Sequence, residues 1–507
     1  MTTDDVVRDD DGWRRLDRRT IGLTAVRCLG SAVVAGVPAT FWVSRALPFW
    51  GALGVVLGAA AVFVGAAALI DRVRWTRTRY RVLPDRFELH KGIVVRSRRS
   101  LQRERIRTVD ITASPLLRLF RVVRVDIGTG EQASGDTSPL LLNPVSRAEA
   151  ESLRRTLLDR ETTGEAVVTD DGTLSTFDLS WVRYAPMSFA TPLLGAAAFG
   201  LTLQVAEWFG MQTDVVLWAL RLLDDLPLVV AILLLVAVGL VIGVIASSAL
   251  FVEMWWQYRL EREPGGTLRV RRGLLTTRSI SVEERRLRGI EVVEPLGNRL
   301  AGAARIDAVA TGMQRSRDEK ADHKTLLPAA PRALASRIGA VVLREAVSPT
   351  DAVRLRSHPR AALGRRVRWA LLAVAAVVLP LVVLGVTLTS VLTHAAWIAA
   401  LVLLPVAVAL AYEAYRGLGH GLSGDYLVTR HGAVRRTTVA LQRSGVIGLT
   451  VRQSVFQRRR GLLTITATTA AGSQGYSAYD VAEHDGLAFA EQAVPGLLTP
   501  FLERVEN

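Results

Sequence analysis

The chain of 507 residues is 50% hydrophobic and 22% charged, with a mean hydropathy of +0.27, which excludes both a disordered chain and an ordinary soluble enzyme. Lys and Arg outnumber Asp and Glu by 63 to 47, which leaves a formal charge of +16, and all but three of these basic residues are arginines. Cys28 is the single cysteine, so intramolecular disulfides and cysteine-held metal or iron–sulfur sites are excluded, and an arginine-rich membrane protein remains.

Long runs without charged residues predict the membrane helices, because a bilayer core takes about 20 apolar residues per helix. The amino-terminal region offers two runs, residues 28–44 and 49–70, and the middle of the chain offers 184–205 and 226–252. Residues 369–412 contain no Lys, Arg, Asp or Glu and are long enough for two spans with a short turn. The sequence therefore predicts six helices in three pairs, and no cleaved signal peptide.

The arginines beside these runs predict the orientation, because short positively charged flanks stay in the cytoplasm. Arginines cluster before and after the first pair and before the third, whereas the tips between paired helices carry few. All eleven tryptophans lie within or close to a predicted membrane segment, as expected of a ring that favours the headgroup level. We expect a multi-pass protein of the bacterial plasma membrane with both termini and all large polar segments in the cytoplasm.

The polar segments after the three pairs repeat one pattern. Residues 101–106 (Leu-Gln-Arg-Glu-Arg-Ile) match residues 441–446 (Leu-Gln-Arg-Ser-Gly-Val), and the two stretches are 340 positions apart without a gap. The middle segment joins at a spacing of 181, where Arg299 matches Arg118 and Arg272-Gly273 matches Lys91-Gly92. One domain is therefore used three times.

Alternating apolar residues predict the local structure of this domain. Residues 80–95 are typical of two strands joined at Lys91-Gly92, and residues 105–112 and 122–127 predict two more. Each repeat closes with a helix pattern, and several antiparallel strands followed by one helix predict a small β-barrel or sandwich capped by that helix. The three expected helices are residues 148–158, 332–343 and 485–494.

The order of these motifs resembles a known family. A strand led by Tyr80, a glycine turn, the Leu-Gln-Arg-x-x-Ile element, a Ser-x-x-x-Arg element and a strand ending in Gly128-x-Gly130 resemble the bacterial pleckstrin-homology-like (PH-like) domain of YdbT-like membrane proteins. The resemblance implies transmembrane pairs that precede the domains, and it brings no catalytic residue or substrate. Two repeats depart from the pattern: the middle one has Val282-Glu283-Glu284 in place of Leu-Gln-Arg, and the third has His420 where the first has Tyr80.

Together these patterns predict a multi-pass α-helical membrane protein with three transmembrane hairpins and three β-rich PH-like domains. The expected segments, in chain order, are a cytoplasmic tail at 1–20, hairpin 1 at 21–70, PH-like domain 1 at 71–160, a linker at 161–183, hairpin 2 at 184–252, PH-like domain 2 at 253–346, a linker at 347–367, hairpin 3 at 368–415 and PH-like domain 3 at 416–507.

No constellation in the sequence predicts catalysis, a metal site or a cofactor. The seven histidines are scattered, and no two have ligand spacing on a helix face. The glycine pairs lack the strand–loop–helix context of a phosphate-binding loop and are interpreted as turns. Arg27 and His394 are the polar candidates inside the membrane runs, one near a helix start and the other at a predicted turn, which does not favour a transport path.

The strongest functional signal is the charge of the first repeat. Residues 71–130 carry 16 Lys or Arg against 6 Asp or Glu, directly after a membrane exit, and anionic lipid attracts such charge by about 1 kcal/mol per basic residue. Two interpretations stay open: a basic face that lies on the inner leaflet, and a specific headgroup pocket. The candidate lipid-contact residues, called the basic strand patch below, are Lys91, Arg96, Arg98, Arg99, Arg103, Arg105 and Arg107.

The leading hypothesis is a non-enzymatic protein that displays three PH-like domains on the membrane. Its expected partners are anionic lipids of the inner leaflet, an unidentified membrane or cytoplasmic protein, and a second copy of itself through self-association. Nucleic acid is not expected, because the repeats lack aromatic residues for base stacking beside the charge. A role in envelope maintenance or stress tolerance fits this architecture. The rival hypothesis is a six-helix transporter or channel that the domains regulate.

Overall fold

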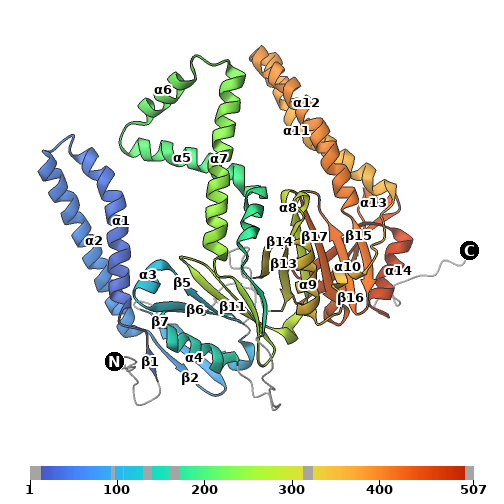
Figure 1. Ribbon diagram of the computed structural model, residues 1–507, viewed down its shortest axis with the longest axis horizontal. Coiled ribbons are helices and arrows are strands. Elements are labelled where there is room, and N and C mark those ends of the chain that lie inside the picture. The colour runs from blue at the N-terminus through green and yellow to red at the C-terminus, as the bar shows by residue number, and fades with distance from the viewer. Residues whose placement is uncertain are drawn as a thin grey trace, which may run out of the picture. The chain divides into compact units, whose positions relative to one another are not determined.

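The computed structural model describes residues 13–92, 97–106, 108–128, 140–158, 172–311 and 324–496 (Figure 1). The chain divides into two compact units, Met1–Glu283 and Glu284–Asn507. This division falls within the second repeat, between its third and fourth strands, so each unit is described by itself.

Five helices in the described part of the chain are long and apolar enough to cross a membrane. In the first unit, α1 (Thr20–Val43) and α2 (Phe49–Arg77) form a hairpin, and α7 (Leu228–Trp255) has the highest hydropathy of the five. In the second unit, α11 (Arg360–Thr387) and α12 (Ser390–Arg416) pack along each other as a hairpin. The candidate helices number up to six if one bent pair counts as a span.

This bent pair replaces the straight span expected at residues 184–205. The 3₁₀ segment η2 (Leu179–Met187) and helix α5 (Ala190–Trp208) meet at an angle of 76°. Pro186 has no N–H to continue the helical ladder, and the Ser188 hydroxyl accepts from the Ala190 N–H at 3.2 Å, so a new helix starts there. Hydropathy alone does not predict this break between η2 and α5. The expected tip between the paired helices also contains a short helix, α6 (Gln212–Leu223).

The first repeat forms a β-rich body with one apolar core. Its interior is built from Tyr80, Phe87, Ile106, Val125 and Leu153, each at most 2% exposed. The elements around this core are β1 (Arg14–Arg15), β2 (Arg79–Val82), β3 (Arg86–Lys91), β4 (Ser97–Gln102), β5 (Thr108–Ala113), α3 (Pro115–Leu119), β6 (Val122–Gly128), β7 (Leu140–Ser146) and α4 (Arg147–Leu158). Helix α4 packs on β5, β6 and β7 (Figure 1).

The strand prediction for this repeat was incomplete. The glycine turn occurs where expected, with Gly92 at φ +134°, but a second turn at Pro84-Asp85 divides residues 80–91 into two strands. The strand after Gly92 begins at Ser97 in the described part of the chain, while residues 93–96 and Gly130 lie outside it.

Strands from two repeats join into one sheet within the first unit. Strand β5 of the first repeat pairs with β11 (Thr277–Glu283) of the second, with Ala113 opposite Thr277 and Ile111 opposite Ser279. The resulting seven-stranded sheet has the order β7-β6-β5-β11-β10-β9-β8. Its remaining strands are β8 (Thr173–Thr176), β9 (Arg259–Glu263) and β10 (Thr267–Arg272).

The second unit repeats this way of joining. Strand β12 (Leu287–Pro295) of the second repeat pairs with β17 (Arg435–Gln442) of the third, within a six-stranded sheet of order β14-β13-β12-β17-β16-β15. A three-stranded sheet, β18-β19-β20, completes the third repeat. The other elements are α8 (Leu296–Leu300), β13 (Ala303–Ala310), β14 (Thr325–Pro331), α9 (Arg332–Leu343), α10 (Pro349–Ala352), β15 (Gly419–Ser423), β16 (Tyr426–His431), β18 (Val446–Arg452), α13 (Val455–Arg458), β19 (Leu462–Thr469), β20 (Gly475–Ala482) and α14 (Glu483–Ala493).

Candidate functional site

The strand register places part of the basic strand patch beside the end of a membrane helix. Helix α2 ends at Arg77 and β2 begins at Arg79, which lies opposite His90 of β3, and His90 lies opposite Arg98 of β4. Because neighbouring strands run antiparallel, the end of β3 at Lys91 and the start of β4 at Ser97 lie at the same end of the sheet as the end of α2. Lys91 and Arg98 are both exposed there.

The other described members of the patch lie elsewhere. Arg99 is half-buried opposite Leu89, and Arg103 follows β4 at the far end of the sheet, where Gln102 lies opposite Arg86. Arg96, Arg107 and the side chain of Arg105 lie outside the described part of the structure. The described residues therefore do not form one cluster, and Lys91 with Arg98 is the pair that lies nearest the membrane helix.

Aromatic side chains border this end of the sheet. The Trp13 ring contacts His90 in a tilted arrangement with 4.3 Å between centroids, and the Arg81 guanidinium lies 4.8 Å from the Trp13 ring. Partial burial and the nearby Arg98 charge lower the pKa of His90 below its ordinary value. We therefore expect a neutral imidazole at pH 7, and the positive charge of this edge comes from the lysine and arginine side chains.

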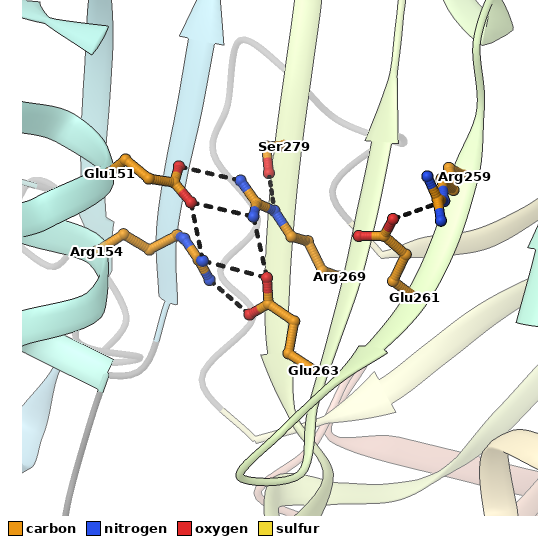
Figure 2. Close-up of polar contacts among 7 residues, drawn as sticks. All are labelled: Glu151, Arg154, Arg259, Glu261, Glu263, Arg269 and Ser279. Atoms are coloured by element: carbon orange, nitrogen blue, oxygen red, sulfur yellow. Dashed lines mark hydrogen bonds and ion pairs between the residues drawn. The ribbon is translucent and has the colours of Figure 1, made fainter. Parts of the chain in front are cut away.

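A buried charge network that the sequence did not predict connects the first repeat to the second (Figure 2). Arg154 of α4 donates to both carboxylate oxygens of Glu263, at 2.8 and 3.1 Å, and to Glu151 at 3.0 Å. Arg269 of β10 donates to the same two carboxylates and, at 2.8 Å, to the hydroxyl of Ser279. Arg154 is 6% exposed and Arg269 is 4% exposed.

The protonation states in this network follow from its geometry. Burial disfavours the charged form of Arg154, but the contacts with Glu263 and Glu151 outweigh burial and raise its pKa. Burial likewise opposes ionisation of Glu151, and the bonds from Arg269 and Arg154 outweigh it, so the pKa of this carboxyl is lowered. The network of two arginines and two carboxylates holds α4 against β9 and β10. Arg154 and Glu263 are 109 positions apart, and Arg269 and Glu151 are 118 apart, so no local pattern could have revealed these contacts.

One buried carboxylate lies within the first membrane hairpin. Asp71 of α2 is 7% exposed, and its Oδ2 accepts from the Thr24 hydroxyl of α1 at 2.9 Å. The prediction had placed Asp71 outside the membrane segment. His394, by contrast, contacts the Ser390 carbonyl in the first turn of α12, close to the predicted turn. Within the described ranges, no group of three or more His, Cys, Asp or Glu side chains could hold a metal ion.

Comparison with known proteins agrees with this architecture. The family model described as "Bacterial PH domain" matches three stretches that together cover well over half of the chain, namely residues 32–161, 197–346 and 369–493. The chain is 22% identical over 453 residues to the transmembrane protein YdbT of Bacillus subtilis (strain 168), which covers 86% of this chain and 88% of that protein. No solved structure matches. With its apolar helices and its three matched stretches, the chain is a transmembrane protein that belongs to the bacterial PH domain family.

Proposed function

We propose that this protein is a non-enzymatic membrane protein that holds its PH-like domains against the cytoplasmic leaflet, where they contact anionic lipids and a protein partner. A role in envelope maintenance or stress tolerance is part of the proposal. The observation that carries it is the direct passage from α2 into β2, which puts the exposed Lys91 and Arg98 at the helix end of the sheet. Exposed basic side chains at this level attract anionic headgroups.

A short passage from a membrane helix into the first strand is also found in the second and third repeats, which supports the same placement of their domains. Helix α7 ends at Trp255 and β9 begins at Arg259, and helix α12 ends at Arg416 and β15 begins at Gly419. Each of these passages is short, so each domain starts at the membrane surface. Counting η2 with α5 as one bent span gives three hairpins, with both termini and the domains on one side of the membrane.

Reporter fusions test this orientation in the full chain. Fusions after Ile70, Val252 and Tyr415 should report the cytoplasm, and fusions near Pro48, Thr213 and Thr393 should report the outside. A cytoplasmic signal near Thr213 would contradict the bent span, because α5 and η2 would then not cross. An outside signal after Val252 would remove the second domain from the cytoplasmic leaflet.

A further inference from the structure

The first unit contains an arginine-lined cavity of about 1100 Å³ where the first and second repeats join. One wall comes from β5, β6 and α4 of the first repeat, and the other from β9, β10 and β11 of the second. Among its described lining residues Glu151 is the one acidic side chain. The lining arginines are Arg118, Arg121, Arg147, Arg155, Arg259, Arg269, Arg271, Arg272 and Arg278.

Acidic side chains contact two of these arginines. Arg269 bonds to Glu151 and Glu263, and Arg259 lies 2.6 Å from a carboxylate oxygen of Glu261. Burial and then repulsion from Arg269 lower the pKa of Arg271, although Glu261, Glu151 and Glu263 act in the opposite direction. So many like charges around one space raise its potential, and an anion that enters relieves the repulsion.

Arg121 occupies a backbone position that the other repeats give to glycine. Its φ is +57°, and the matching residues Gly302 and Gly461 have φ of +71° and +59°. A left-handed backbone is unfavourable for a residue with a Cβ atom, whereas glycine adopts it readily. The first repeat therefore keeps an arginine at the edge of the cavity against its own backbone preference, as residues at binding sites often do.

In the second unit, a carboxylate of the protein itself pairs with the arginines at the corresponding join between repeats. Glu294 of β12 stands where β5 has Ala113, and Arg436 of β17 stands where β11 has Thr277, with each pair directly opposite across the join. Glu294 is 2% exposed, accepts from Arg436 Nε at 3.1 Å and also contacts Arg332. The first join has no carboxylate at this position, and the described cavity is there instead.

The cavity lies beside the end of a membrane helix. The N–H groups of Gly273 and Leu274 both donate at 2.9 Å, to the carbonyl groups of Trp256 and Glu253 at the end of α7. The Arg272 guanidinium lies 4.2 Å from the Trp255 ring. Because α7 is apolar and long enough to cross a membrane, we expect this wall of the cavity to lie near the headgroup level.

We propose that this cavity binds a phosphate-bearing anion, and that its occupant in the membrane is a phospholipid headgroup with an accessible phosphate. Guanidinium groups pair with phosphate oxygens in a bidentate manner, so several arginines around one space recognise phosphate better than they recognise a carboxylate or chloride. This site is formed by two repeats, and it lies apart from the exposed contact of Lys91 and Arg98. It goes beyond the proposed function and does not depend on it.

The test uses the full chain in a neutral detergent with two probes, short-chain phosphatidic acid and inorganic pyrophosphate. Native mass spectrometry should show one bound phosphatidic acid per chain, and thermal unfolding should shift upward with its concentration. Short-chain phosphatidylcholine, which carries a quaternary amine on its phosphate, is the matched neutral probe. Binding of phosphatidic acid but not pyrophosphate supports a lipid site. Binding of pyrophosphate but not phosphatidic acid would overturn the lipid assignment and identify a soluble phosphate compound as the ligand. Equal binding of all three probes, or binding of none of them, would overturn the proposal.

Two variants separate binding from folding. Arg121→Gly relieves the left-handed backbone, so it should leave the thermal midpoint without ligand unchanged or higher, yet weaken binding of phosphatidic acid by about tenfold. Arg271→Gln should weaken it similarly. Arg459→Gln is the control, because Arg459 is an exposed arginine of the second unit, outside both the cavity and the edge with Lys91 and Arg98, and the change should leave this binding unchanged. Retention of wild-type affinity by both cavity variants would contradict the assignment, whatever the outcome for Lys91 and Arg98.

Discussion

Removing Arg154 should loosen the join between the first two repeats. This side chain makes three charge-assisted hydrogen bonds, two to Glu263 and one to Glu151, and each such bond contributes about 1.5–3 kcal/mol. In Arg154→Leu both carboxylates keep Arg269, and with side-chain exposures of 23% and 26% they also reach water. We therefore discount the full sum and expect a loss of about 3 kcal/mol, the lower end for breaking a buried ion pair.

Hydrogen exchange of the full chain in nanodiscs measures this loss locally. A change of about 3 kcal/mol should speed the exchange of the β5 and β11 amides roughly a hundredfold, since a factor of ten corresponds to about 1.4 kcal/mol. The control is Arg155→Leu, which changes the neighbouring exposed arginine and should alter exchange little. Equal protection of β5 and β11 in wild type and Arg154→Leu would refute the reasoning, because the network would then not hold the two repeats together.

Further predictions concern the second unit, the repeat cores and the membrane path. Asp480 is 1% exposed and contacts Arg365, Arg366 and Gln457. Asp480→Ala should therefore lower the free energy of unfolding by about 3 kcal/mol and with it the thermal midpoint of the full chain. Asp425→Ala, at an exposed position, is the control. Burial, followed by the charge of Arg356, lowers the pKa of His420 to about 4, so the unfolded chain binds a proton that the folded chain does not. The free energy of unfolding that the neutral His420 contributes is fully present above about pH 6.5 and is lost as the pH falls from about 6.5 towards 4. The variant His420→Phe should flatten this dependence of the unfolding free energy on pH, measured by unfolding at a series of pH values. Ile106 is 1% exposed and Val446 only partly buried, so proteolysis should show a larger loss of stability in Ile106→Asp than in Val446→Asp. Proteoliposomes should show no solute flux that depends on Asp71, and flux abolished in Asp71→Asn would support the rival transport hypothesis.

Much of the fold followed from periodic patterns. The helix expected at residues 332–343 has the bounds of α9, because Pro331 and an amphipathic stretch mark its start and face. Hydropathy also located α7, α11 and α12. It missed the bend after Pro186, because charge-free runs do not distinguish a straight helix from a broken one.

The joins between repeats could not have been predicted in the same way. Pairing of β5 with β11 depends on backbone N–H and C=O groups at two strand edges, which are common to most residue types. The cavity combines Arg121 with Arg271, which are far apart in sequence and belong to different repeats. A sequence signal did exist, namely an arginine at a position where both other repeats have glycine, but its meaning depends on the left-handed backbone that the structure reveals.

The depth in the membrane of Lys91, at the end of β3, tests the central claim most directly. The sequence has one cysteine, so a Cys28→Ala background accepts a single fluorescent label at Lys91→Cys or, as the distal control, at Asp85→Cys in the β2–β3 turn. Positions 85 and 91 lie about 20 Å apart, at about 3.3 Å per residue along β3. In nanodiscs with headgroup spin-labelled lipid, the label at position 91 should be quenched more strongly than the label at 85, and anionic lipid should increase this difference. Equal quenching at both positions, or stronger quenching at 85, would contradict a domain that meets the membrane at its helix end.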